Sequence, residues 1–186
     1  FQNSDMKKII PNVGSRLTFT FSSVDIPSEV PKEAVKRKLD KDRVFELELF
    51  SQPEMRSLRT KFRQNLSRRG VSASNREFDR IFDQVMKKVA GKIEKDFEKV
   101  GVGHVIGEDR HYGDGRDSQE WFYVVKWPTG RKIRKRFGFE EADFHVTLGM
   151  TGNGVDDIRK DETTLLDDKD LDYRDEGLSK LFVNEE

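Results

Sequence analysis

Alternating apolar and polar residues predict β-strands in two stretches near the start of the chain. Residues 17–22 alternate leucine and phenylalanine with threonine and serine, and residues 43–50 repeat this pattern with valine, phenylalanine and leucine. Because successive side chains of a strand point to opposite faces, each stretch predicts a strand with one buried face. Between them, residues 27–31 predict a loop that leads into a short helix ending near Leu39.

Two longer stretches have the spacing of amphipathic helices. Apolar side chains recur every three or four residues over 52–69, and Gly70 follows as a helix terminator. The same spacing continues over 78–97, preceded by Ser74 and Glu77 in the pattern of a capping box. The second of these predicted helices is the longest in the chain.

The second half of the chain predicts mainly strands. Residues 102–106 are apolar enough for a short strand, and residues 107–119 form a loop rich in glycine and aspartate. Residues 121–139 predict a β-hairpin with its turn at Pro-Thr-Gly, 128–130, and a further strand follows at 144–148. This order of strands and helices indicates an α+β fold.

Composition predicts a globular protein with a heavily charged surface. The chain has 35 basic and 35 acidic residues, so no net charge draws it to nucleic acid or a membrane. We expect one domain over residues 1–186, in which residues 156–186 form an acidic, irregular segment.

The absence of cysteine excludes disulfides and thiol nucleophiles. No apolar run is long enough for a membrane helix, and the amino end lacks a signal-peptide core. We therefore expect an intracellular protein, cytoplasmic or nuclear, without a membrane partner. Because the chain begins with Phe1, we also expect further sequence outside it, with possible fused domains.

His145 and Thr147 are the most informative pair of polar residues. They alternate with apolar residues over 144–148, so they share one face of the predicted strand. An imidazole that carries protons near neutral pH, beside a hydroxyl donor, suits chemistry on phosphate. Arg16 and Thr18 repeat the pattern with arginine in place of histidine, which predicts corresponding strands of a duplicated lobe around one cleft.

Residues 144–150, Phe-His-Val-Thr-Leu-Gly-Met, resemble the second H-x-T/S motif of the two-histidine (2H) phosphoesterases. The following residues 155–161 resemble the Swiss-army-knife RNA-repair branch of that superfamily. The resemblance implies two lobes with antiparallel sheets, flanking helices and a cleft between pseudo-symmetric lobes. It also implies metal-independent hydrolysis of a cyclic phosphodiester, with no cofactor. One imidazole accepts a proton from water, the other protonates the leaving oxygen, and two hydroxyls hold the non-bridging oxygens.

The first motif departs from the family pattern. A guanidinium has too high a pKa to exchange protons at neutral pH, so Arg16 can bind phosphate but cannot replace a catalytic histidine. The resemblance therefore implies an acid/base role for His145, phosphate contacts for Thr147 and Thr18, and an electrostatic role for Arg16. The site then either works with one histidine, recruits His104 or His111, or binds phosphate without turnover.

A basic and aromatic cluster lies just before the His145 strand. Such a mixture neutralises phosphates and stacks on bases in proteins that bind single strands, although a solvated hairpin with an aromatic core face has the same composition. The predicted contacts with RNA or a nucleotide are Tyr123, Trp127, Arg131, Arg134, Arg136 and His111. The arginines of residues 56–69 are more simply a solvated helix face, and no motif for a metal site is present.

Three functions follow from these observations. The leading hypothesis is a cyclic phosphodiesterase that acts on RNA 2′,3′-cyclic phosphate ends or a small cyclic nucleotide. The second is a lapsed site that holds an RNA end or a nucleotide phosphate. The third is a protein interaction module that uses the charged helices and the acidic segment.

Overall fold

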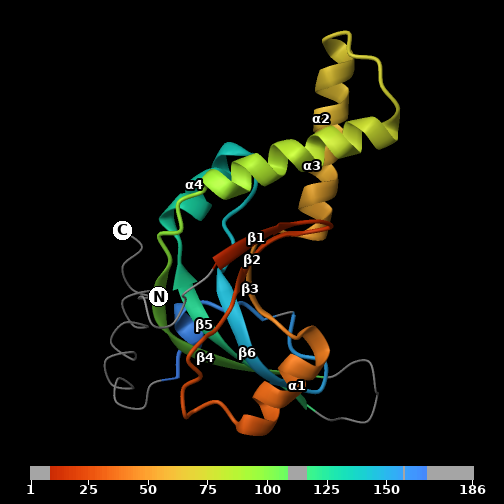
Figure 1. Cartoon of the computed structure of the whole chain (residues 1–186). Helices are drawn as coiled ribbons and strands as arrows, with labels where there is room; N and C mark the ends of the chain where they lie inside the picture. The colour runs from red at the N-terminus through yellow and green to blue at the C-terminus, as the bar shows by residue number, and fades with distance from the viewer. Residues whose placement is uncertain (1–8, 109–116, 157, 167–186) are drawn as a thin grey trace. The chain divides into compact units, whose positions relative to one another are not determined.

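A computed structural model of the chain describes residues 9–108, 117–156 and 158–166 (Figure 1). This part of the chain holds six strands, four α-helices and a 3₁₀ helix, Glu162–Thr164. The chain divides into two compact units. The first contains the residues up to Asp25 together with Val44–Glu98 and Lys126–Phe144, and the second contains Ile26–Arg43, Lys99–Val125 and the residues from His145 onward.

The first unit is built on an antiparallel sheet in which β2 (Leu17–Phe21) lies between β1 (Ile9–Val13) and β3 (Phe45–Phe50). Strands β2 and β3 lie where alternation predicted strands, but in β2 Thr18 is buried as well as the apolar residues, so the expectation of a single buried face is wrong for this strand. Strand β1 was not predicted, because its five residues include Pro11. A proline donates no hydrogen bond to the sheet and is tolerated here because β1 is at an edge.

Aromatic rings form the core on one face of this sheet. Phe19 is fully buried and meets the ring of Trp127 edge-on, with 5.1 Å between the centroids. Phe97 packs against both rings, at 6.0 Å from Phe19 and 4.7 Å from Trp127. Edge-to-face contacts of this kind stabilise a core beyond the area they bury.

Helices α2 (Gln52–Arg68) and α3 (Asn75–Lys92) confirm the two predicted amphipathic helices. The Ser51 hydroxyl accepts a hydrogen bond from the backbone N–H of Glu54, whose carboxylate accepts one from the Ser51 N–H, so a full capping box begins α2. The Ser74 hydroxyl accepts a hydrogen bond from the backbone N–H of Glu77, so one half of the predicted capping box begins α3. Helix α3 ends at Lys92, earlier than predicted, because the apolar spacing continues into a non-helical segment that is still buried.

The predicted hairpin over 121–139 is wrong. Residues from Pro128 to Arg136 form helix α4, and only the first half of the stretch is a strand. Proline suits the first turn of a helix, and basic residues in the last turn of α4 complement the helix dipole. Gly130 lies so close to Trp127 that a Cβ would be 2.4 Å from indole carbon atoms, so the turn closes tightly over that ring.

The second unit packs helix α1 (Lys32–Asp42) on an antiparallel sheet of β4 (Glu98–Glu108), β5 (Asp117–Lys126) and β6 (His145–Thr151). A Cβ on Gly149 of β6 would lie 3.0 Å from backbone atoms of α1, so glycine permits the close approach of this helix to the strand.

The α+β class with two antiparallel sheets and flanking helices is confirmed. The expected correspondence of the two motif strands is not reproduced in strand order. Strand β2 is central in its sheet, whereas β6 lies at an edge of the order β4-β5-β6. Helix α1 follows β2 in the chain but belongs to the second unit, and α4 follows β5 but belongs to the first.

Candidate functional site

His145 and Thr147 lie on one face of β6, as the alternation predicted. In the register with β5, His145 is opposite Val124 and Thr147 is opposite Phe122. The intervening Val146 is completely buried and faces the other side of the sheet, whereas His145 and Thr147 are half-buried. The edge strand therefore presents an imidazole and a hydroxyl side by side.

One side of the His145 ring packs against an apolar cluster. The ring meets the edge of Phe122 with 5.9 Å between centroids and an interplanar angle of 74°. Phe122 is fully buried in a cluster with Val105, Val124 and Val155. These side chains reduce the access of water to one side of the imidazole and restrict the positions that its ring can take.

Thr147 belongs to a buried polar network that the sequence did not reveal. Its hydroxyl donates to Glu120 Oε2 at 3.1 Å, and the backbone N–H of Val155 donates to Glu120 Oε1 at 3.2 Å. Lys160 Nζ lies 3.5 Å from Glu120 Oε2 and donates to the carbonyl oxygen of Val155. Glu120 and Lys160 are both buried, so the carboxylate and the ammonium compensate each other's charge.

This network constrains what Thr147 can do. Because the hydroxyl has one hydrogen and gives it to Glu120, Thr147 holds a phosphate oxygen only if the hydroxyl rotates away from that carboxylate. Gly154, with φ of +79°, brings the backbone close to the network, and a Cβ there would lie 2.8 Å from Glu120 Oε1. The sequence signal that points to this network is an acidic residue, Glu120, directly before the apolar run 121–125 of the same strand.

His104 is engaged on the opposite face of the sheet. Its ring stacks on Trp121 at 4.6 Å between centroids, and its Nε2 lies 2.9 Å from Gln119 Oε1. Trp121 alternates with Phe122, whose side chain is on the His145 face, so His104 is not available to His145. The position of His104 therefore does not favour the alternative in which the site recruits this residue, and His111 lies outside the described residues.

Arg16 of the first unit has two carboxylate partners. Its guanidinium donates to Glu46 at 2.7 Å and to Glu48 at 3.1 Å, both on β3. Partial burial alone would lower the pKa of Arg16, but these hydrogen bonds and the two negative charges outweigh burial and raise it. Thr18, two residues along the chain, is buried. The positive charge of Arg16 is thus more than compensated locally.

Three of the predicted RNA contacts are buried side chains. Trp127 and Tyr123 are only 2% and 3% exposed, so neither ring offers a face to a base. Trp127 Nε1 also donates to the backbone oxygen of Glu94 at 2.9 Å, and Lys99 Nζ lies over the Tyr123 ring at 4.6 Å. Arg134 is 6% exposed and forms an ion pair with Glu54. The burial and internal contacts of these three side chains do not favour the predicted contacts with RNA.

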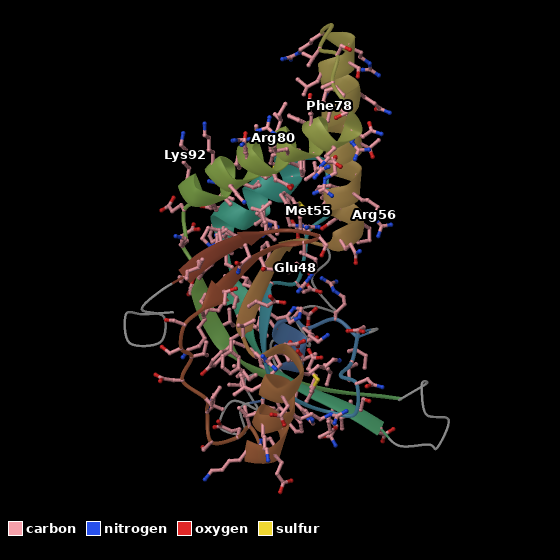
Figure 2. All side chains as sticks on the ribbon, turned by 45° about the vertical axis from the view of Figure 1, so that its right-hand side comes forward. Glu48, Met55, Arg56, Phe78, Arg80 and Lys92 are labelled. Atoms are coloured by element: carbon pink, nitrogen blue, oxygen red, sulfur yellow. The ribbon has the colours of Figure 1, made fainter. Side chains whose placement is uncertain are left out.

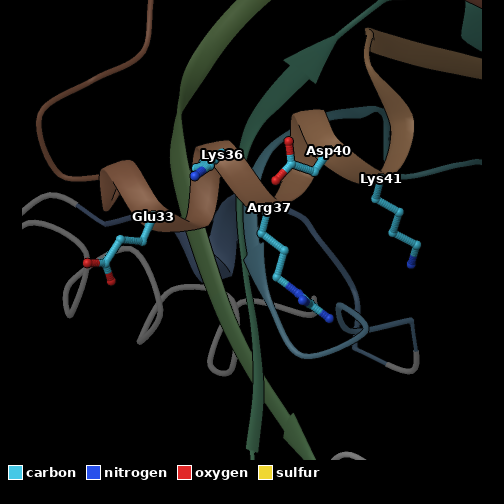
Figure 3. A pocket seen from close by; sticks show the side chains of 5 residues that line it. All are labelled: Glu33, Lys36, Arg37, Asp40 and Lys41. Carbon is cyan, nitrogen blue, oxygen red and sulfur yellow. The ribbon is translucent and has the colours of Figure 1, made fainter.

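Arg131 and Arg136, by contrast, are exposed on α4, and Arg131 forms an ion pair with Glu141. A hollow of about 450 Å³ contains none of the predicted site residues and is lined by Glu33, Lys36, Arg37, Asp40 and Lys41 of α1 (Figure 3). Over the described residues, no group of three or more His, Asp or Glu side chains is arranged to hold a metal, and no helix is long and apolar enough to cross a membrane.

Comparison with protein families matches residues 31–155 to the Swiss Army Knife, 2H phosphoesterase domain. The match covers about two thirds of the chain and includes His145 and Thr147, but it begins after Arg16 and Thr18. No curated protein and no solved structure matches the chain. The family match agrees with the α+β fold and with the H-x-T motif on β6, and the chain belongs to the Swiss Army Knife group of 2H phosphoesterase domains.

Proposed function

We propose that this phosphoesterase domain hydrolyses 2′,3′-cyclic phosphate at the end of an RNA, or a small cyclic nucleotide with the same ring. His145 is the proton carrier. The observation that supports this proposal most directly is the pairing of His145 with Thr147 on one face of β6, inside the region that matches the family. The family membership supports a phosphodiester substrate in general, and the cyclic ring is the proposed refinement.

A single imidazole supplies one of the two proton transfers that the reaction needs. A water oxygen bonds to phosphorus while the bond from phosphorus to one ribose oxygen breaks. His145, in its protonated form, gives a proton to that leaving oxygen. The attacking water loses a proton to solvent, and solvent returns a proton to His145. The product is a ribose with one free hydroxyl and one phosphate monoester.

The surroundings of His145 suit this role. Phe122 packs against the ring edge and limits its orientation, which favours a reproducible direction of proton transfer. Lys160 compensates the charge of Glu120, so the carboxylate bonded to Thr147 repels an incoming phosphate less than an unpaired carboxylate would.

A second candidate is phosphate binding without turnover, because Arg16 stands where the family pattern has its first histidine and cannot exchange protons at neutral pH. Thr147 donates its hydroxyl hydrogen to Glu120, and Arg16 is held by Glu46 and Glu48. A ligand phosphate would have to replace these carboxylates as the partner of each side chain. A domain of this kind would bind a nucleotide or an RNA end and release it unchanged.

Hydrolysis of 2′,3′-cyclic CMP by the purified chain separates the two candidates, with His145→Gln as the test variant and His104→Gln as the matched control. The enzyme hypothesis predicts turnover that falls by roughly 10²- to 10⁴-fold in His145→Gln and stays within a few-fold in His104→Gln. Binding measured by calorimetry without turnover supports the second candidate. Equal turnover in both variants contradicts the role of His145.

A further inference from the structure

The helical pair α2–α3 of the first unit carries a strong local charge in a chain that has none overall. Between Gln52 and Lys92 there are eleven lysine and arginine residues but only four aspartate and glutamate residues. The rest of the chain must therefore be acidic by the same amount, since the totals are equal. This separation of charge produces a positive field around the helical pair that the net charge conceals.

Two of the four carboxylates of the pair are used internally. Asp79 and Asp83 form ion pairs with Arg59 and Arg63, which join α2 to α3. Arg59 also lies over the ring of Phe82, at 5.1 Å. In these ion pairs the charges of Asp79 and Asp83 are neutralised by the partly buried Arg59 and Arg63. The aspartates therefore do not compensate the exposed cations of the pair.

Nine cations of the pair are exposed, against the exposed carboxylate of Glu77 and those of Asp79 and Asp83, whose side chains are 37% and 42% exposed but form ion pairs within the pair. Across the described residues, none of the nine has an ion pair. They are Arg56, Lys61, Arg68, Arg69, Arg76, Arg80, Lys87, Lys88 and Lys92. We call them the basic surface. Figure 2 shows Arg80 and Lys92 on the side of α3 that points away from the sheet of the first unit.

Part of the basic surface lies along one stripe of α3, interrupted by Asp83, whose carboxylate forms an ion pair with Arg59. Arg76, Arg80 and Lys87 are spaced by four and seven residues, so they lie on one stripe of α3. Arg76 and Lys87 are therefore roughly 16 Å apart along the helix axis. A row of cations of this length matches the regular negative charge of a nucleic-acid backbone better than a single phosphate group.

We propose that the basic surface docks the phosphate backbone of single-stranded RNA without reading its sequence. This inference extends the proposed function, because it assigns a surface that holds the polymer whose end is hydrolysed. Five of the nine cations are arginines, whose planar guanidinium suits two-point contact with phosphate. No large aromatic side chain among the described residues of the pair is exposed, so base stacking contributes little and charge sets the affinity.

Helix α1 offers a contrast within the same chain. Its lysines Lys32, Lys36 and Lys41 are exposed, but carboxylates of Glu33 and Asp40 lie among them around the hollow of Figure 3. Removal of three charges from α1 changes the net charge of the protein as much as removal of three from the basic surface. The two changes differ only in which surface loses the charge.

Fluorescence anisotropy with a labelled 20-nucleotide RNA of mixed sequence, measured over a series of salt concentrations, tests the proposal. The test variant is Arg76→Gln/Arg80→Gln/Lys87→Gln, and the control is Lys32→Gln/Lys36→Gln/Lys41→Gln. A second test variant on α2, Arg68→Gln/Arg69→Gln, guards against loss of folding in the first, and circular dichroism checks all three. Hydrolysis of 2′,3′-cyclic CMP is measured in parallel.

We expect the triple α3 variant to bind the RNA roughly tenfold or more weakly at low salt, with a salt-dependence slope smaller by about 2, because each lost phosphate contact removes about 0.7 from the slope. The salt-dependence slope of the α2 variant should be smaller by about 1.4. The α1 control should retain the wild-type slope, and turnover of the mononucleotide should be equal in all four proteins.

Equal slopes in the α1 and α3 triple variants would overturn the proposal, as would displacement of the RNA by poly-glutamate at equal charge concentration. Loss of mononucleotide turnover in every protein, with the slope difference intact, would instead contradict the proposed hydrolysis and leave the docking surface supported.

Discussion

Replacement of Arg134 by alanine tests whether this side chain holds the first unit together, as its contacts indicate. The guanidinium donates to both carboxylate oxygens of Glu54, at 2.8 and 2.7 Å, and to the backbone oxygens of Leu49 and Glu140, at 2.7 and 2.9 Å. The alanine variant leaves a mostly buried carboxylate and two carbonyl oxygens without these donors.

The expected loss of stability is large. Removal of one partner of a buried ion pair costs roughly 3–5 kcal/mol, because the other charge stays in a poorly solvated place. Urea unfolding followed by circular dichroism should show this decrease in the free energy of unfolding. Arg134→Lys should recover only part of it, since a single ammonium cannot reproduce the two-point contact with Glu54.

Arg136→Ala is the matched control, because Arg136 is an exposed residue of the same helix. Its effect should remain within about 0.5 kcal/mol. If Arg134→Ala unfolded at the wild-type urea concentration and lost only affinity for RNA, the structural role assigned to Arg134 would be refuted, and the residue would return to the binding site.

Three further predictions concern contacts within each of the two units. Gly149→Ala should cost roughly 1–3 kcal/mol in thermal unfolding because its Cβ meets α1, whereas Gly91→Ala, with open space around it, should not destabilise. Burial raises the pKa of Glu54, but the hydrogen bond and charge of Arg134 lower it below its usual value. The ionised carboxylate therefore stabilises the fold above about pH 4.3 and loses this effect as the pH falls further, so acid should destabilise wild type more steeply than Glu54→Gln. Lys160→Met should destabilise the second unit by leaving Glu120 buried without its cation, and the double variant with Glu120→Gln should recover much of the loss.

Local periodicity accounts for the elements that the sequence predicts correctly. Apolar and polar residues alternate through β2 and through β3 up to Leu49. Helices α2 and α3 have apolar residues at helical spacing and a serine cap. Each of these elements can therefore be predicted from its own residues. Helix α4 was missed because its buried face includes Arg134. Gly130, Ile133, Arg134 and Phe137 have helical spacing, but an arginine is read as polar unless its partner Glu54, eighty residues away in the chain, is known.

The features of the candidate site were also predicted only where they depend on a single stretch of sequence. The shared face of His145 and Thr147 follows from alternation in one strand and was predicted. The partner of Thr147 is Glu120 of β5, and the partners of Arg16 come from β3, so both sets of contacts depend on strand register. The burial of Tyr123 and Trp127 depends on tertiary packing, and composition alone does not distinguish a ring in the core from a ring that stacks on a base.

The central claim is that His145 moves a proton in the hydrolysis of a cyclic phosphodiester. The most direct measurement is the ratio of kcat/KM for wild type and His145→Gln on an RNA that ends in a 2′,3′-cyclic phosphate. We expect kcat/KM to be roughly 10²- to 10⁴-fold higher for wild type than for His145→Gln, with the fold of both proteins intact. A ratio near one, or wild-type protein that leaves the cyclic phosphate unopened, would contradict it.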